Sequence, residues 1–201
     1  MSPTAKNVKL RALAEVSAGH PVRGAVDELP EGDVAMVQMR DVGSEGWIDW
    51  EGVVRIDPPG KRLPDFLRPG DLIFTTRGAR NIAAVVENFP GTAICAPNLF
   101  IIRVAAGAAC LPDYLGWYMN QRPAQAYFQR SATGTSIMNI RREVVEALEV
   151  PVPDLREQQV IVGMSHAARA EKRLFQQLIQ NRDQQMEALA AALAGSTEAR
   201  L

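Results

Sequence analysis

The sequence changes character within the stretch Val150-Pro-Val-Pro-Asp-Leu-Arg-Glu-Gln-Gln-Val-Ile-Val162. Its two prolines end a short predicted strand, because proline cannot donate a hydrogen bond to a β-ladder. Asp154 can cap a helix, and Glu157 follows at the spacing of a capping box. No proline occurs after this point in the 201-residue chain. We therefore expect a domain over residues 1–152 and a helical segment over residues 153–201.

The segment after the junction has the pattern of one long helix. Residues 155–194 would span roughly 60 Å as a helix, and apolar residues recur at alternating steps of three and four, as in the seam of a coiled coil. Such a helix cannot bury its seam against its own domain over the whole length, so we expect a partner helix. The alternative is one or two ordinary helices that fold back after a break at Gly163. The seam consists of Ile161, Ala168, Phe175, Ile179, Met186, Leu189 and Leu193, with polar interruptions at Ser165, Lys172 and Arg182.

The part before the junction is rich in short strands separated by glycine and proline. A helical or mixed segment is expected over residues 5–18, and a helix over residues 112–130. Short strands at close spacing indicate a compact, mainly antiparallel sheet or barrel-like core. The expected fold class is therefore α+β, with a β-rich domain that carries helices and a long helix after it. The predicted strands cover residues 34–42, 47–56, 72–75, 82–86, 92–95, 99–104 and 148–152.

Composition favours a globular protein, with 47% hydrophobic and 22% charged residues. The apolar runs are far shorter than the roughly 20 residues that span a bilayer, so we expect no membrane contact. The first residues lack the apolar stretch of a signal peptide, which predicts a cytoplasmic protein. In that compartment Cys95 and Cys110 are expected to be buried free thiols. Together with His20 and His166 they do not form a zinc-ligand spacing, so we expect no metal.

Charge is distributed unevenly although the net charge is only −1. Residues 1–54 carry 5 basic and 9 acidic side chains, and residues 143–201 carry 6 basic and 9 acidic side chains. Residues 55–142 carry 11 basic and 5 acidic side chains, a net charge of +6. The middle segment can therefore form a basic surface that the total charge conceals.

Motifs of common catalytic sites are missing from the sequence. It contains no Gly-x-x-x-x-Gly-Lys-Ser/Thr loop, no Gly-x-Gly-x-x-Gly and no Gly-x-Ser-x-Gly elbow. None of its four lysines follows an acidic residue by two positions, as one class of nuclease requires. We therefore expect a protein without its own catalytic residues and without a cofactor. An unrecognised hydrolase or lyase on a small mixed fold is the enzymatic alternative.

Polar loops in and just before the basic segment carry residue types that contact DNA. Arginine and asparagine read guanine and adenine edges bidentately, and small hydroxyl residues beside glycine let the backbone approach a phosphate. A solvated charge is the ordinary role of any single arginine here, and for Gln38 and Asn98 a hydrogen bond within a turn or strand is the alternative. Together the loops favour nucleic-acid binding. The candidate contacts are Gln38, Arg40, Arg77, Arg80, Asn81, Asn98, Thr133, Gly134, Thr135, Ser136, Asn139, Arg141 and Arg142.

The local motifs, taken in order, resemble those of the specificity subunit of type I restriction–modification systems. The junction quoted first is similar to the family's hydrophobic-Pro-x-Pro-x-Leu-x-Glu-Gln-x-x-Ile pattern and is the most diagnostic piece. The other pieces are Leu67-Arg-Pro-Gly-Asp-Leu-Ile-Phe-Thr-Thr-Arg-Gly78, Asn98-Leu-Phe-Ile-Ile-Arg103, Leu111-Pro-Asp-Tyr-Leu-Gly-Trp-Tyr-Met-Asn120 and Thr133-Gly-Thr-Ser136.

This resemblance implies one target-recognition domain, about residues 1–152, followed by one helical spacer. Family members usually carry two of each, so the chain looks like a half-subunit. The implied partners are double-stranded DNA, a DNA adenine methyltransferase subunit and, through it, a restriction subunit. Two copies that pair their long helices antiparallel would read two inverted half-sites. The alternative is an interaction module that binds the methyltransferase without reading DNA.

Overall fold

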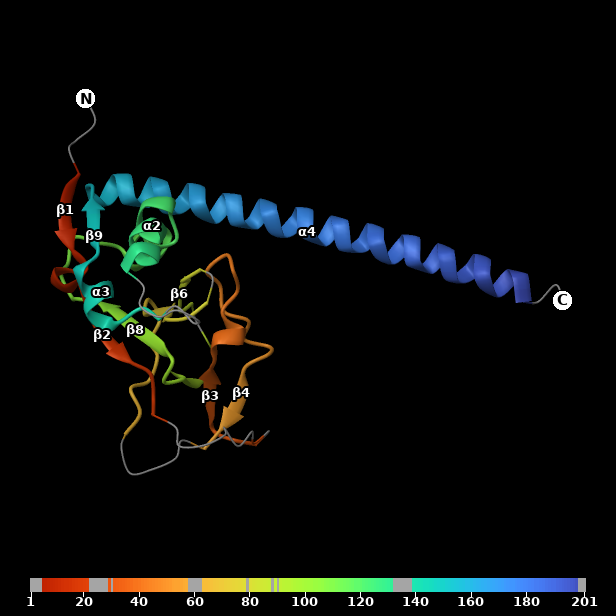
Figure 1. Ribbon diagram of the computed structural model, residues 1–201, viewed down its shortest axis with the longest axis horizontal. Helices are drawn as coiled ribbons and strands as arrows, with labels where there is room; N and C mark the ends of the chain where they lie inside the picture. Colours follow the sequence, from red (N-terminus) through yellow and green to blue (C-terminus); the bar gives the residue numbers. More distant parts are fainter. Residues whose placement is uncertain are drawn as a thin grey trace. The chain divides into compact units, whose positions relative to one another are not determined.

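The computed structural model describes residues 5–21, 29, 31–57, 63–78, 80–87, 89, 91–131 and 139–198. The chain divides into two compact units, Met1–Val162 and Gly163–Leu201. The first unit is α+β, as predicted, and the second consists of the greater part of one long helix (Figure 1). The division falls beyond residue 152 because the first turns of this helix belong to the first unit.

The first unit is closed by a pair of strands from its two ends. Strand β1 (Lys6–Lys9) pairs antiparallel with β9 (Glu149–Val152), and Lys6 lies opposite Val152. A short 3₁₀ turn, η1 (Leu10–Ala12), follows β1, and the Leu10 amide donates to the Leu148 carbonyl. The predicted helical or mixed segment over residues 5–18 is therefore two strands joined by a turn. Its strand character depends on pairing partners that lie far away in the sequence.

A four-stranded antiparallel sheet forms the central layer of this unit. Its strands β2 (Ala14–Ala18), β8 (Leu99–Val104), β5 (Leu72–Thr75) and β6 (Ala83–Val85) lie in that order. Leu72 and Phe74 pack with the helices on one side, whereas Ile73 packs with a second sheet on the other. Both faces of β5 are consequently buried, which accounts for its unbroken apolar sequence.

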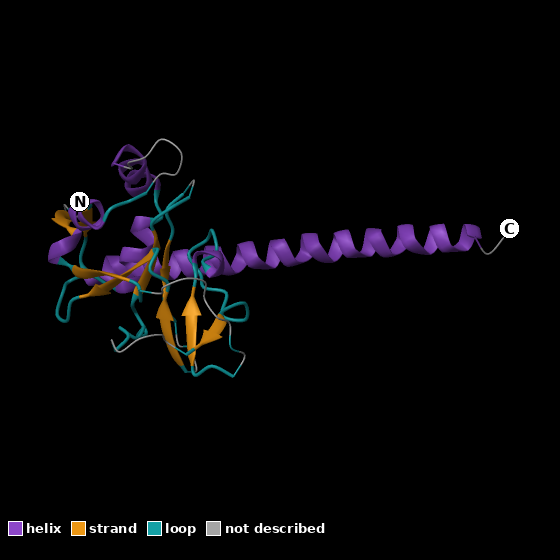
Figure 2. Ribbon diagram, turned by 60° about the horizontal axis from the view of Figure 1, so that its bottom comes forward, coloured by secondary structure: helices purple, strands orange, loops and turns teal. Residues whose placement is uncertain are grey.

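The second sheet has three strands, seen as neighbouring arrows in Figure 2. β3 (Val34–Val37) lies between β4 (Val54–Ile56), which is antiparallel to it, and β7 (Thr92–Cys95), which is parallel to it. The predicted strand over residues 34–42 ends early because a 3₁₀ turn, η2 (Met39–Asp41), follows β3. Of the strand predicted over residues 47–56, only the last three residues form β4.

The predicted helix over residues 112–130 is two helices, α1 (Pro112–Met119) and α2 (Arg122–Ser131). Pro123 has no amide hydrogen and its ring collides with the carbonyl four residues earlier, so a continuous helix is broken here. That carbonyl belongs to Met119, and the Gln125 side chain donates to it at 2.8 Å. A third short helix, α3 (Arg142–Ala147), leads into β9.

The long helix is confirmed as α4 (Leu155–Glu198), and it continues through Gly163. The Asp154 carboxylate accepts the Glu157 amide at 2.8 Å, which confirms the predicted N-terminal cap. From residue 170 to residue 192 every side chain of α4 is exposed. Phe175, Ile179, Met186 and Leu189 of the predicted seam are 57–61% exposed.

One buried glutamine attaches the start of α4 to the domain. Gln158 is fully buried, and its side-chain oxygen accepts the Leu111 amide at 2.8 Å. Its side-chain nitrogen donates to the carbonyls of Ala109 and Pro153, both at 2.9 Å. All three partners lie outside α4, so this side chain ties the helix to the loop before α1. Gln158 stands in the junction stretch that the sequence analysis found most diagnostic.

Both cysteines are buried free thiols, as predicted. Burial raises the pKa of Cys95 to about 12 and that of Cys110 to about 11. Both thiols are therefore protonated at neutral pH, which makes them poor nucleophiles. No helix in the described residues has the length and apolar content needed to cross a membrane.

Replacing Gln158 with Leu should lower the free energy of unfolding by about 2–4 kcal/mol, because buried peptide groups of Leu111, Ala109 and Pro153 lose their partner. The change can be measured by urea denaturation followed by circular dichroism. The matched control is Gln159→Leu on the exposed face of the same helix turn, which should change stability by less than about 0.5 kcal/mol. Equal stability of the two variants would contradict the anchoring role.

Candidate DNA interface

Three segments meet where β5 ends. Arg77 forms an isolated antiparallel bridge with Asn139. Next to it the Ile140 amide donates to the Thr76 carbonyl at 2.9 Å, and the Thr76 hydroxyl donates to the Asn98 carbonyl at 2.8 Å. The structure therefore brings together three predicted contact residues from distant parts of the sequence.

Exposure differs among these residues. Arg77 is exposed, whereas Asn98 and Asn139 are half-buried, and Thr76 is only 5% exposed. Thr76 was not among the predicted DNA contacts, although its hydroxyl and its carbonyl hold all three segments together. Four further predicted contacts come shortly before Asn139 in the sequence and lie outside the described residues. They are Thr133, Gly134, Thr135 and Ser136.

Two buried amide side chains, Asn81 and Gln125, hold the loop between β5 and β6 in place. Asn81 is 7% exposed, and its side-chain nitrogen donates to the Thr75 carbonyl at 2.8 Å. The Thr75 hydroxyl accepts the Ile82 amide at 2.7 Å, and the Gln125 side chain donates to the Asn81 carbonyl at 2.6 Å. Asn81 was predicted to contact DNA, but its amide donor is used inside the protein. We therefore assign it a role in holding the loop.

Arg80 is exposed and rests on the corner between α1 and α2. Its guanidinium donates to the main-chain carbonyl of Asn120 at 2.8 Å. The Asn120 side chain pairs with both backbone groups of Ala83, accepting the amide at 3.0 Å and donating to the carbonyl at 2.7 Å. Asn120 thus covers the free edge of β6 and positions the Arg80 guanidinium at the same time.

The two residues predicted after β3 have different environments. Gln38 and Asp41 form a capping box around η2, in which the Gln38 amide donates to the Asp41 carboxylate at 2.8 Å. The pKa of the Asp41 carboxyl is raised overall, because the effect of burial exceeds the lowering by the Gln38 amide and the Arg40 charge. The Arg40 side chain is 59% exposed and its Nε lies 3.7 Å from that carboxylate.

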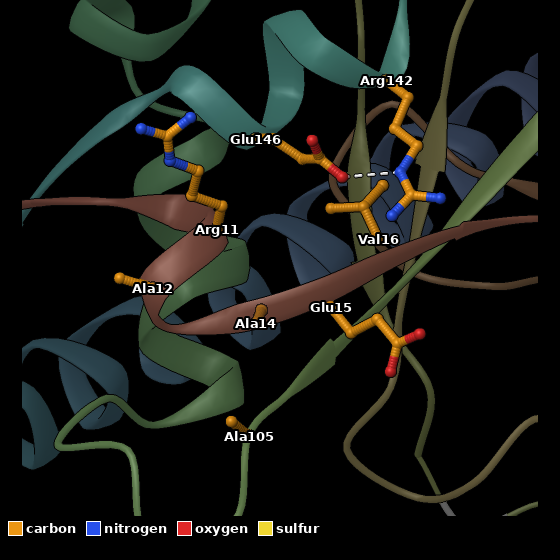
Figure 3. A pocket seen from close by; sticks show the side chains of 8 residues that line it. All are labelled: Arg11, Ala12, Ala14, Glu15, Val16, Ala105, Arg142 and Glu146. Atoms are coloured by element: carbon orange, nitrogen blue, oxygen red, sulfur yellow. Dashed lines mark hydrogen bonds and ion pairs between the residues drawn. The ribbon is translucent and has the colours of Figure 1, made fainter.

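The two arginines that begin α3 face different surroundings. Arg141 is exposed at the N-cap position. Arg142 pairs with Glu146 at 2.6 Å and lines an open hollow of about 360 Å³ between α3 and the chain of η1 and β2 (Figure 3). Arg11 and Glu15 line the same hollow, so the charges of its two guanidinium groups and two carboxylates cancel. Arg142 is therefore engaged in an ion pair on a surface formed by α3, η1 and β2.

No group of three or more His, Cys, Asp or Glu side chains in the described part of the chain is placed to hold a metal ion. The site consists instead of exposed guanidinium groups on loops that buried hydrogen bonds fix in place. Such an arrangement suits the recognition of an anionic polymer with readable edges.

Solved structures of type I restriction–modification subunits share this fold. An HsdS subunit from Thermoanaerobacter tengcongensis aligns with a TM-score of 0.58 at 17% identity over 85% of this chain. A type I restriction–modification system S subunit from M. genitalium aligns with a TM-score of 0.53 at 15% identity over 82% of it. This chain has the fold of a type I specificity subunit.

A third structure, concerned with complex assembly and conformational transition of the type I R-M system, aligns with a TM-score of 0.58 at 17% identity over 85% of the chain. The alignments cover 40%, 39% and 41% of the matched chains, so this protein spans about two fifths of their length. No family model and no curated protein matches the sequence. The resemblance of its motifs to those of specificity subunits is thus confirmed at the level of the fold.

Three residues that hold the site were not predicted, namely Thr76, Asn120 and Gln125. Pro123 was the available signal for Gln125, because a proline four residues after Met119 leaves a carbonyl without its helical partner. Thr76 and Asn120 gave no comparable signal, since their partners lie 22 and 37 positions away.

Removing the Asn120 side chain by an Asn120→Ala substitution should destabilise the first unit by about 2 kcal/mol, because two backbone groups of Ala83 lose their partners. Urea unfolding measured by circular dichroism checks this. Gln129→Ala, on the exposed face of α2, is the control and should cost less than about 0.5 kcal/mol. An Asn120→Ala variant as stable as the control would show that the corner does not depend on this side chain.

Proposed function

We propose that the chain is a non-catalytic DNA-recognition module of a type I restriction–modification-like system. It would bind double-stranded DNA and position an adenine methyltransferase subunit and, through it, a restriction subunit, in the cytoplasm. The observation that carries the proposal is the specificity-subunit fold, found in structures of HsdS and of a type I S subunit. The gathering of Arg77, Asn98 and Asn139 at one point of the basic segment adds to it.

Arg77 is the best candidate for reading a base. Its backbone is fixed by the bridge to Asn139 while its side chain stays exposed, so the guanidinium can reach the O6 and N7 atoms of a guanine. Arg80 and Arg40 are exposed as well and suit contacts to phosphates, which set the register of a protein on the duplex. Asn98, Asn139 and Arg141 complete the described part of the proposed interface. Thr133–Ser136, outside the described residues, stay proposed contacts on the basis of the sequence alone.

Deleting the gene from its source cell should abolish methylation at one DNA motif, measured by single-molecule methylome sequencing. Re-expression of the Arg77→Ala chain should fail to restore that motif or restore a relaxed version, because a lost bidentate contact costs about 1–3 kcal/mol. Arg173→Ala on α4 removes the same charge from an exposed helix position and should restore methylation in full. If the Arg77→Ala chain restores the unchanged motif, the chain positions the methyltransferase without reading DNA through this residue.

We further propose that two copies pair through α4. Phe175, Ile179, Met186 and Leu189 present an apolar stripe that the chain itself does not cover in the described structure. Burying one large apolar side chain contributes about 1.5–3 kcal/mol, so a continuous stripe supplies a strong drive to associate. An antiparallel pair would carry two identical recognition units and suit a two-fold split site.

Analytical ultracentrifugation of the full chain at about 20 μM should show a dimer, since the stripe would bury several large side chains. The double substitution Ile179→Glu and Leu189→Glu should convert it to a monomer, because charged groups resist burial. The double substitution Gln177→Glu and Gln184→Glu adds the same charge to the opposite face and should leave the dimer intact. A monomeric wild-type chain at this concentration would refute the pairing.

A further inference from the structure

A short hairpin follows β3 and η2 in the first unit. Val42 and Ile48 form an antiparallel bridge, and the Gly43 amide donates to the Trp47 carbonyl at 2.9 Å. The Gly46 amide donates to the Gly43 carbonyl at 3.0 Å, which closes a tight turn. Gly46 has a φ of +79°, a conformation that residues with a side chain rarely adopt. The hairpin therefore has a defined shape.

The hairpin presents one tryptophan to solvent. Trp47 is 46% exposed, and its indole lies flat against Gly43, where an added Cβ would come within 2.5 Å of the ring atoms Cε2 and Nε1. The other two tryptophans serve packing, since Trp50 stacks on Phe89 at 4.2 Å and Trp117 lies 5.5 Å from Tyr114. An exposed indole held in one orientation is a surface suited to binding, because it adds apolar area at little cost in conformational entropy.

This hairpin lies against the corner that positions Arg80. A Cβ on Gly46 would come within 2.8 Å of the Ala83 carbonyl and 2.9 Å of the Asn120 side-chain nitrogen. Asn120 is the residue whose main-chain carbonyl accepts the Arg80 guanidinium. The hairpin tip and Arg80 therefore share one support, which places the hairpin beside the proposed DNA interface.

The charges around the indole favour a contact with bases or sugars over one with phosphates. The carboxylates of Asp41 and Asp49 are used locally, accepting the amides of Gln38 and Glu51. Together with Glu45, which stands in the hairpin itself, they make the hairpin an unfavourable place for a phosphate. An uncharged aromatic ring instead suits deoxyribose atoms, the methyl group of thymine or the face of a base. Arg40 and Arg80 beside the hairpin can take the flanking phosphates.

We propose that Trp47 is a DNA-contacting residue that binds apolar sugar or base atoms beside Arg80. This inference rests on the proposed DNA recognition and extends it to a residue outside the basic segment. A contact of this type contributes affinity without displacing counterions, so its loss has a signature that differs from the loss of an arginine.

The first test measures access to the indole. The full-length chain with Trp50→Phe and Trp117→Phe keeps Trp47 as its sole tryptophan, whose emission is excited selectively over that of tyrosine. The probe is a duplex selected from a random library by the wild-type chain. Bound DNA should reduce acrylamide quenching of Trp47 at least twofold. The chain with Trp47→Phe reports the two packed tryptophans and should show no such change. Unchanged quenching of Trp47 with DNA bound would overturn the proposal and leave the proposed function standing.

The second test separates an apolar contact from a charged one. Trp47→Ala should weaken binding of the selected duplex about tenfold with an unchanged slope of log affinity against log salt concentration. Arg80→Ala should instead lower that slope by about 1. Gly43→Ala keeps the indole but displaces it, and should weaken binding to an intermediate degree. Circular dichroism melting curves show whether each variant is folded.

The remaining outcomes are also decisive. If Trp47→Ala binds DNA as well as the wild type does, Trp47 is not a DNA contact. If the indole is shielded only when the methyltransferase subunit is added and not by DNA, the hairpin is a protein-docking element and the proposal is wrong. If library selection with the wild-type chain enriches no duplex, the proposed DNA recognition and this inference fail together.

Discussion

Burial of β5 on both faces is the constraint on which the first unit depends. Leu72, Ile73 and Phe74 are all fully buried, and their alternating side chains supply two separate cores. A strand in this position has to be covered by helices on one side and by a sheet on the other. The end of β5 therefore lies between the helices and the second sheet, where segments from both sides can reach it. Thr76 bonds to the residue before β8 and to the segment before α3 for this reason.

Sequence patterns predicted the elements whose character is local. β5, β7 and β8 have the expected bounds, and the long helix begins at the expected cap. Elements that depend on distant partners were predicted less closely. Residues 5–18 form strands because β9 supplies a partner at the other end of the domain, and the parallel pair of β3 and β7 leaves no trace in the local pattern. The division between α1 and α2 was readable from Pro123 and was missed.

The predicted contact residues illustrate why a site is harder to predict than a fold. Asparagine and glutamine offer the same donor and acceptor to a base edge and to a peptide group. Asn81 and Gln38 bind peptide groups within the protein, whereas Arg77 and Arg80 keep exposed guanidinium groups. Residue type cannot separate these cases, because the folded structure decides which partners a side chain meets. Trp47 was overlooked because the local sequence does not show whether a tryptophan is exposed or packed, and here the ring lies against Gly43 and is 46% exposed.

The pairing of β1 with β9 places the two ends of the first unit's strand framework side by side, with Lys6 opposite Val152. A unit closed in this way is a self-contained structural module. It can be joined to another helix, repeated in tandem or exchanged for a unit with different loops, and the neighbouring segments need not move to bridge its ends. The protein spans about two fifths of the length of the solved chains that share its fold. One such module with its helix is a natural building block for chains as long as those.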